Sequence, residues 1–186
     1  MRKDLGVKPY ILPMPVLIVS AYDENGNANA MNAAWGTICD MDKVLLVLSA
    51  THKTTKNILS SKAFCVGTAN KENMISSDYV GIVSGNKTTD KIKNTGWNLE
   101  KSKFVNAPII TSLPLSLECK LLSYDTENEI LIGEIVNVSA DESIIESDNV
   151  NIEKANPIVY DPTSHSYYAL GEKVGKAFCD GKKIIR

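Results

Sequence analysis

Short strand-like segments separated by turn residues recur along the whole chain, and this repetition limits the possible folds more than any other feature. Each segment is either apolar throughout or alternates between apolar and polar residues, as a strand with one buried face does. The predicted strands cover residues 16–22, 28–35, 44–49, 63–68, 115–124, 129–140, 157–160 and 166–170. Helical spacing is confined to residues 55–62, 72–83 and a short stretch at 89–94. Many short strands with few helices predict a mainly β protein built as an antiparallel barrel.

Local signals add detail to this barrel. The Asn25-Gly26 pair favours the positive backbone angles of a tight hairpin, so it joins the strands on either side of it. The segment 44–49 is apolar throughout, which predicts a strand buried on both faces of a closed barrel. The polar stretch 84–104 is predicted to be a long loop that contains the short helix, and loops of that length are often functional.

Residues 27–36 look selected for a ligand rather than for packing. They read Asn-Ala-Asn-Ala-Met-Asn-Ala-Ala-Trp-Gly, and such small side chains let a flat ring approach the main chain and hydrogen-bond to it. Trp35 either belongs to this wall or is a buried barrel aromatic whose indole N–H is bonded internally. The segment therefore predicts a wall of a planar-ring site.

Residues 49–57 are instead rich in hydroxyl groups and positive charge. Because they follow a strand and lead into a helix, their main-chain N–H groups and several side chains can converge on an anion such as phosphate, namely Thr51, Thr54, Thr55 and either Lys53 or Lys56. Two ordinary readings compete: a solvated loop, or a helix cap supplied by Ser49 or Thr51. Taken with residues 27–36, the segment predicts a site for a ring that carries a phosphate tail.

These segments belong to a longer pattern that extends over nearly the whole chain. It consists of Pro13-x-Pro15, Asn25-Gly26, the 29–35 segment, His52-Lys53-Thr54-x-x-Asn57-Ile58, Asp78-Tyr79-Val80-Gly81, Ser84-Gly85, Asp90-Lys91, Thr95-Gly96, Leu117-Glu118-Cys119, Gly133-Glu134-Ile135-Val136 and Tyr168-x-Leu170-Gly171. With this pattern the chain resembles the flavin reductase-like family of FMN-binding split barrels, which includes flavoredoxins and short-chain flavin reductases. One departure is Asp40-Met41-Asp42-Lys43, which stands where many relatives have Asp-Pro-Pro and so alters the loop that shapes substrate access.

The resemblance implies a single domain over residues 1–186, folded as an antiparallel, Greek-key-like split β-barrel with a few short helices. It assigns Asn32, Ala33, Ala34 and Trp35 to the ring and ribityl region of FMN, Ser49, Ala50 and Thr51 to the ribityl and phosphate side, and His52, Lys53, Thr54 and Asn57 to the phosphate. Lys91 is a flavin or substrate contact by the same resemblance, or else a solvated lysine on a helix face. The family also implies a homodimer with its sites at the subunit interface.

If FMN is bound, it supplies the redox chemistry, which explains why no catalytic triad or carboxylate pair marks the predicted site. The leading expectation is a flavin or ferric reductase in which NADH or NADPH delivers hydride to FMN. The alternative is a flavoredoxin-like electron carrier that keeps FMN bound and exchanges electrons with a redox protein partner. No dinucleotide fingerprint separates the two. A flavin-binding module without turnover is a third possibility, and FMN is favoured over FAD because no adenine-binding segment is evident.

Composition restricts the partners and the compartment. With 20 Lys and Arg against 22 Asp and Glu, the chain has no basic excess for nucleic acid, and two histidines are too few for a metal cluster. No apolar run approaches the ~18 residues of a membrane span, and no signal-peptide cleavage site follows the first apolar run, so we expect a cytoplasmic protein. The cysteines form no C-x-x-C pair; Cys65 and Cys119 are expected to pack inertly, while Cys39 has no assigned role. His165 is either a turn residue or a neighbour of a ring.

Overall fold

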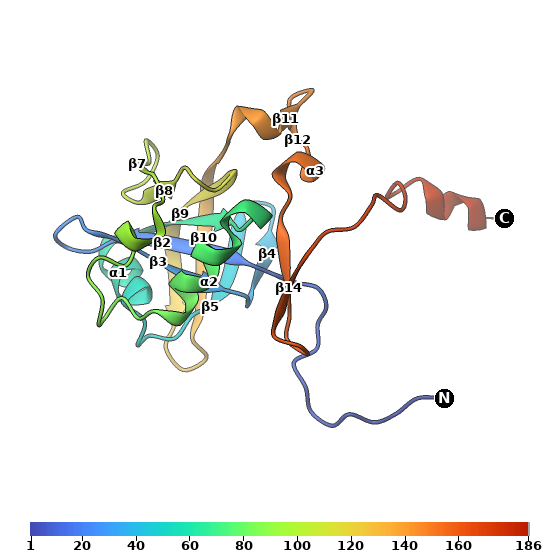
Figure 1. Cartoon of the computed structure of the whole chain (residues 1–186), viewed down its shortest axis with the longest axis horizontal. Coiled ribbons are helices and arrows are strands. Elements are labelled where there is room, and N and C mark those ends of the chain that lie inside the picture. Colours follow the sequence, from blue (N-terminus) through green and yellow to red (C-terminus); the bar gives the residue numbers. More distant parts are fainter. Residues whose placement is uncertain (186) are drawn as a thin grey trace.

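The computed structural model describes residues 1–185, and its centre is a curled sheet of seven antiparallel strands (Figure 1). The strands lie in the spatial order β3-β2-β6-β9-β10-β5-β4. Their bounds are Leu17–Tyr22 (β2), Ala28–Ala33 (β3), Gly36–Asp40 (β4), Lys43–Val47 (β5), Ala63–Thr68 (β6), Leu115–Asp125 (β9) and Ile130–Ala140 (β10). The predicted mainly β, antiparallel split barrel is therefore confirmed.

The two edges of this sheet are joined by a short corner. Strands β3 and β4 lie at opposite ends of the spatial order, yet only Ala34 and Trp35 separate them in the sequence. The sheet must therefore curl until its edges approach each other, and next to the corner the Val47 N–H donates to the Trp35 carbonyl at 2.9 Å. Sequence reasoning missed β4 and extended β3 to residue 35, because Gly-Thr-Ile-Cys-Asp has little of the apolar pattern of a strand.

The curl encloses the main core, in which Phe64, Leu46 and Leu131 are fully buried. A Cβ on Gly133 would lie 2.4 Å from Cζ of Phe64, so glycine lets strand β10 cross the phenyl ring. Strand β5 alternates instead of being buried on both faces: its inner residues are buried, whereas Leu45 and Val47 are only partly covered. That prediction was wrong because β5 lies next to the edge strand β4, where the outer face has little cover.

Helices α1 (Lys53–Ser61) and α2 (Met74–Ile82) both contact strand β3, and α1 also contacts β2 and β6. Helix α1 begins two residues before its predicted start at residue 55, while α2 follows the 3-10 turn η1 (Lys71–Asn73). The short helix predicted near 89–94 lies later in the chain: residues 89–92 form turns, and the helical part is the 3-10 helix η2 (Lys93–Thr95). Lys91 and Trp97 are buried in this segment, so it covers the barrel instead of extending into solvent.

The remaining elements are shorter. A three-stranded sheet has the order β1-β13-β14, with bounds Met14–Pro15, Ile158–Asp161 and Ser166–Ala169. Two strand pairs and three short helical elements complete the chain, namely β7 (Leu99–Lys101) with β8 (Pro108–Ile110), β11 (Ile145–Glu146) with β12 (Asn149–Val150), η3 (Glu142–Ile144), α3 (Ile152–Ala155) and η4 (Asp180–Ile184). None of the described helices has the length and apolar character needed to cross a membrane.

A second core joins the β13–β14 hairpin to the barrel. It includes Ile18 of β2, Val80 of α2, Ile158 of β13 and the buried Trp97. The hairpin therefore stands close to α2, while the two terminal segments extend away from the barrel (Figure 1). This packing creates a series of cavities along the β3 edge and the corner that follows it.

Candidate functional site

The first cavity, of about 190 Å³, lies between the start of α1, strand β3 and the segment that follows α2. His52, Lys53 and Thr54 reach it from α1, and Lys91 reaches it from the turns beyond α2. We call this space the lysine cavity. It brings together residues nearly forty positions apart, because the 84–104 segment folds back over the barrel.

Lys91 is the most unusual residue of the lysine cavity. Only 3 % of it is exposed, and burial lowers the pKa of its ammonium group from 10.5 to about 8. Within residues 1–185, the ion pairs involve Lys43, Lys53, Lys154 and Lys183 but no carboxylate partner of Lys91. The reading of Lys91 as a solvated lysine was therefore wrong. A buried cation without a counter-ion is costly, so this cavity favours an anionic ligand.

A buried hydroxyl lies in the same cavity. The Asn29 side-chain amide donates to Oγ1 of Thr54 at 2.7 Å, and Thr54 is 1 % exposed. Since this oxygen already accepts one hydrogen bond, its own proton is available to donate to a ligand. A Cβ on Gly85 would lie 2.4 Å from Oδ1 of Asn29, so glycine is required for the close approach of the loop. Asn29 and Gly85 lie in the predicted motifs, although neither was assigned to the site.

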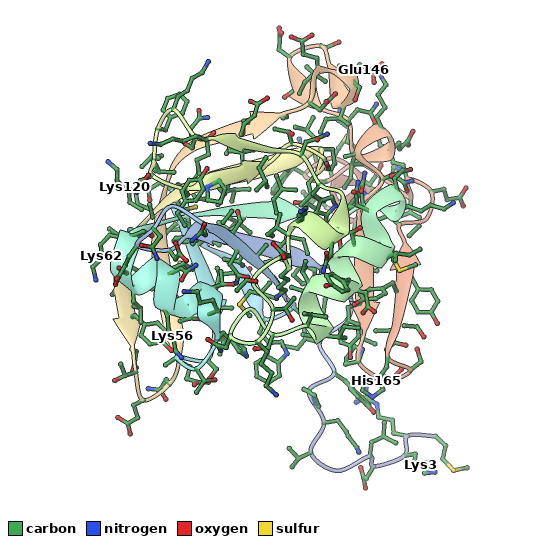
Figure 2. All side chains as sticks on the ribbon, turned by 60° about the vertical axis from the view of Figure 1, so that its left-hand side comes forward. Lys3, Lys56, Lys62, Lys120, Glu146 and His165 are labelled. Atoms are coloured by element: carbon green, nitrogen blue, oxygen red, sulfur yellow. The ribbon has the colours of Figure 1, made fainter. Side chains whose placement is uncertain are left out.

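The start of helix α1 adds a partial positive charge to this cavity. His52 is the N-cap residue and makes no side-chain capping bond, so N–H groups of the first turn remain available. The hydroxyls of Ser49 and Thr51 lie 3.0 Å apart and neither caps the helix, which makes the capping alternative wrong. Lys56, the other lysine considered from sequence, is exposed on the outer side of α1 (Figure 2).

A second space, of about 370 Å³, lies between α2 and the β13–β14 hairpin, and we call it the hairpin cavity. Asn32 and Gly81 line both this cavity and the lysine cavity, so the two are adjacent. The Tyr167 hydroxyl donates to Oδ1 of Asp78 at 2.8 Å. Burial and this carboxylate raise the pKa of Tyr167 to about 12, so the tyrosine remains protonated and holds its side chain against α2.

His165 also lines the hairpin cavity. It is exposed, has a φ of 54°, and lies at the end of the β13–β14 hairpin near the N-terminal segment (Figure 2). Its Nδ1 is 3.0 Å from the Tyr160 hydroxyl, and the rings of Tyr160 and Tyr167 are 5.9 Å apart. His165 is therefore a turn residue, as one of the two readings held, and it also lies beside aromatic rings.

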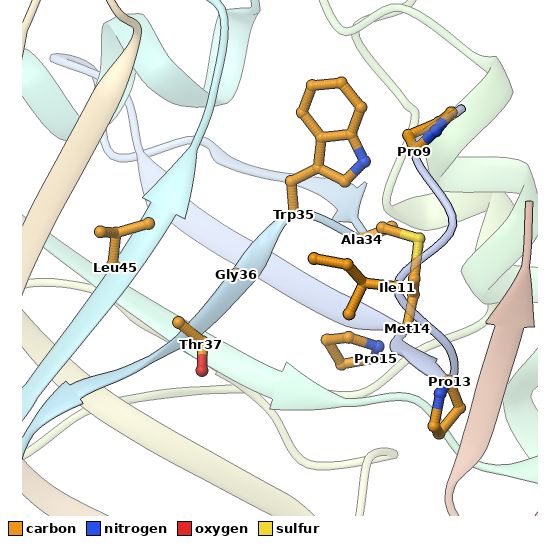
Figure 3. Close-up of a pocket in the computed structure, with 10 residues that line it drawn as sticks. All are labelled: Pro9, Ile11, Pro13, Met14, Pro15, Ala34, Trp35, Gly36, Thr37 and Leu45. Atoms are coloured by element: carbon orange, nitrogen blue, oxygen red, sulfur yellow. The ribbon is translucent and has the colours of Figure 1, made fainter. Parts of the chain in front are cut away.

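The third space, the apolar pocket, has a volume of about 530 Å³ and lies at the β3–β4 corner (Figure 3). Ala34, Trp35 and Leu45 line it together with N-terminal residues such as Pro9 and Ile11. Trp35 is 57 % exposed, so the alternative of a buried barrel aromatic was wrong. Because Ala34 lines both this pocket and the hairpin cavity, the three spaces follow one another; we call them together the crevice.

The structure brings seven of the twelve predicted site residues to the crevice, namely Asn32, Ala34, Trp35, His52, Lys53, Thr54 and Lys91. Ala33 points into the barrel core, because neighbouring strand residues face opposite sides. Asn57 is on the inner face of α1, 3 % exposed, and its amide lies 3.5 Å from the Ala21 carbonyl. The remaining three, Ser49, Ala50 and Thr51, lie in the loop before α1 and outside the cavity walls.

Asp78, Tyr160 and Tyr167 line the crevice but were not assigned to it from sequence. The Asp78-Tyr79-Val80-Gly81 motif forms part of α2. Its glycine allows the helix to pack closely against β3, since a Cβ on Gly81 would lie 3.1 Å from Cβ of Asn32. No local signal points to the two tyrosines. Their place depends on the hairpin docking against α2, which is a tertiary contact.

The cysteines and the 40–43 segment, which were considered from the sequence, have structural explanations outside the crevice. Burial raises the pKa of the Cys65 thiol to about 12 and also raises that of Cys119, as expected for inert packing. The unusual 40–43 segment forms the β4–β5 turn, where Lys43 Nζ pairs with Asp40 Oδ2 at 2.7 Å. Within the described part of the chain, no group of three or more His, Cys, Asp or Glu residues is arranged to hold a metal ion.

Comparisons with known proteins give a consistent family. The model of the flavin reductase like domain matches residues 10–167. A flavoredoxin of Desulfovibrio vulgaris (Miyazaki F) is 33 % identical, with a TM-score of 0.93 over 98 % of this chain and 100 % of its own. A flavoredoxin from Methanosarcina acetivorans is 25 % identical, with a TM-score of 0.87 over 98 % and 99 % of the two chains. An uncharacterized protein of Aquifex aeolicus is 27 % identical over 80 % of each chain.

Proposed function

The chain belongs to the flavin reductase like domain family, and from this premise we propose that it is an FMN-binding oxidoreductase. One observation carries the proposal. The crevice begins at a buried lysine that has no carboxylate partner among residues 1–185, and it ends at an exposed tryptophan beside apolar side chains. FMN has the matching order of a charged phosphate, a polar ribityl chain and a flat ring. The similarity to two flavoredoxin structures supports the same ligand class.

In this proposal the lysine cavity holds the phosphate. Lys91 and Lys53 supply positive charge, the Thr54 hydroxyl donates a hydrogen bond, and the start of α1 adds its partial positive charge. The donor set suits a phosphate monoester, since phosphate oxygens only accept hydrogen bonds when fully ionised. Lys91 gains most from the ligand, because the phosphate provides the counter-ion that its buried ammonium lacks.

The ring and ribityl chain then extend along the rest of the crevice. Asn32 is fixed by the bond from its amide to the Ser77 carbonyl at 3.1 Å, which leaves its Oδ1 free to accept from a hydroxyl or a ring N–H. The small side chain of Ala34 leaves space for the ring beside strand β3. Trp35 offers an aromatic face in the apolar pocket. When bound, FMN supplies the redox chemistry, while these residues orient it and limit its contact with water.

The electron donor separates two forms of this function. In the first, NADH or NADPH delivers hydride, and the protein acts as a flavin or ferric reductase. In the second, FMN stays bound and exchanges electrons with a redox protein, as an electron carrier does; the 33 % identity to a flavoredoxin favours this form.

An absorbance experiment tests the function. The purified chain is supplemented with FMN, desalted, and treated without oxygen first with NADH and then with NADPH. A retained flavin band that bleaches with either nucleotide identifies the reductase, and a band that bleaches only with dithionite identifies the carrier. Failure of FMN to bind at micromolar concentration in a direct titration would contradict the FMN-binding proposal.

We further propose that the chain forms a homodimer. Trp35, Ile38 and Met41 are exposed apolar residues on or near strand β4, with exposed fractions of 57 %, 56 % and 96 %. Such a group on a sheet edge is more typical of a subunit contact than of a solvated surface. Light scattering during size-exclusion chromatography measures the mass directly, and a monomer at tens of micromolar would contradict the proposal.

A further inference from the structure

The β2–β3 hairpin turn brings a carboxylate next to a lysine of the lysine cavity. Oδ2 of Asp23 lies 3.6 Å from Nζ of Lys53. The side chains are 16 % and 34 % exposed, respectively, so the pair is partly shielded from solvent. Lys53 therefore differs from Lys91: it already has a counter-ion before any ligand enters.

The position of Asp23 does not depend on Lys53. Its Oδ1 accepts hydrogen bonds from the main-chain N–H groups of Asn25 at 3.0 Å and Asn27 at 2.9 Å. These turn contacts lower the pKa of the Asp23 carboxyl, so it is ionised at neutral pH. The turn therefore presents a fixed negative charge to Lys53, and a phosphate that approaches Lys53 has to compete with this charge.

This inference rests on the proposed FMN site: we propose that Asp23 competes with the FMN phosphate for Lys53 and so lowers the affinity of the site for FMN. The phosphate carries about −1.5 to −2 charges at neutral pH, and it gains less from Lys53 when the Asp23 carboxylate already pairs with that lysine. Lys91 alone then supplies an uncompensated charge. The chain thus binds FMN less tightly than its two lysines would allow.

The variant Asp23→Asn tests this inference with little structural change. The asparagine oxygen can still accept both main-chain hydrogen bonds, while the negative charge and the acceptor for the Asn27 side-chain amide at 3.3 Å are removed. Asp125→Asn is a matched control. Asp125 accepts from the main-chain N–H groups of Glu127 at 2.9 Å and Asn128 at 3.2 Å in the β9–β10 turn, and within residues 1–185 it pairs with no lysine. The control loses the same kind of bond, from the Asn128 side-chain amide to Asp125 at 2.7 Å. Both variants change the net charge equally.

The measurement is a titration of the full flavin-free chain with FMN and with riboflavin, followed by flavin fluorescence. Riboflavin has the same ring and ribityl chain but no phosphate. We expect Asp23→Asn to lower the Kd for FMN by roughly three- to fivefold, the upper part of the range for a partly exposed charge pair, and to leave the Kd for riboflavin unchanged. Asp125→Asn should change neither value. When Lys53→Ala is also present, Asp23→Asn should change the Kd for FMN by less than twofold.

The outcomes separate this inference from the function on which it rests. If the wild-type chain binds FMN no more tightly than riboflavin, the phosphate assignment itself fails. If the wild type prefers FMN but Asp23→Asn leaves its Kd unchanged, the proposed competition is overturned and the site stands. Equal tightening of riboflavin, an equal effect of Asp125→Asn, or a full effect without Lys53 would also overturn the competition.

Discussion

The two ends of the crevice differ in how they are built. The lysine cavity is small and made from buried polar residues, and glycine at position 85 is needed for its walls to approach each other. The apolar pocket is larger, and Trp35 stands exposed at its edge beside the N-terminal segment. The lysine cavity requires one kind of ligand group, which is a counter-ion for Lys91. The apolar pocket provides apolar surface and an aromatic face but no specific polar partner.

In the proposed FMN site, the two ends would therefore act on different parts of the ligand. A buried, unpaired cation discriminates strongly between a phosphorylated ligand and its neutral analogue, since the neutral analogue leaves the charge uncompensated. An exposed aromatic face binds any flat ring of suitable size. Riboflavin and FMN differ only in the phosphate, so comparing them isolates the contribution of each end.

The largest effect is expected from Lys91→Met, which keeps the side-chain length but removes the charge. FMN binding should weaken by about 1.5–3 kcal/mol, the value of a hydrogen bond to a charged group, and riboflavin binding should barely change. Lys93→Met is the control, since Lys93 is exposed in the same segment. Isothermal titration calorimetry measures both ligands. An equal loss for FMN and riboflavin would show that Lys91 supports the fold of the crevice rather than the phosphate.

The same variant should affect the flavin-free protein in the opposite direction. At neutral pH a charged, unpaired Lys91 destabilises the folded state, so Lys91→Met is expected to raise the thermal midpoint without FMN. Differential scanning fluorimetry in the absence and presence of FMN provides the comparison. If the thermal midpoint without ligand falls by several degrees, then Lys91 has a stabilising partner, and the lysine cavity does not need an anionic ligand to balance its charge.

A smaller, about tenfold effect is expected from pH. The pKa of Lys91 lies at about 8 in the ligand-free protein, and a bound phosphate must raise it because it favours the ammonium form. Binding therefore takes up a proton above pH 8, and the affinity for FMN should fall by about tenfold between pH 7 and pH 9. Riboflavin should show no such fall over this range. The dependence should disappear in Lys91→Met, and its persistence there would assign the titration to another group.

The smallest effect is expected from Trp35→Ala at the other end of the crevice. Removing the aromatic face should weaken FMN and riboflavin equally, by about 0.5–1.5 kcal/mol. Trp97→Phe provides the control, since Trp97 is buried, its indole N–H donates to Asn73 at 2.8 Å, and it lines none of the three cavities. A selective loss of FMN would contradict the division of tasks between the two ends.

Much of the fold followed from local patterns. The Asn25-Gly26 hairpin, most of the barrel strands and the two main helices have the periodicity or turn residues that predict them. The short β4 strand was missed because its pairing with β5 defines it, rather than its own composition. The short helix expected near 89–94 is limited to the 3-10 turn at Lys93–Thr95, because Lys91 and Ile92 are buried against the barrel, and burial is not visible in the local sequence.

Local sequence patterns were enough to predict a mainly β barrel, the family resemblance and a hydroxyl-rich basic loop that leads into α1. The three-dimensional arrangement was needed to show which candidate residues share one crevice. Within residues 1–185 it buries Lys91 away from any carboxylate partner, exposes Trp35 at the corner between β3 and β4, and places Tyr167 against Asp78. Strand and helix patterns are local properties, whereas burial and charge pairing depend on segments that are distant in the sequence.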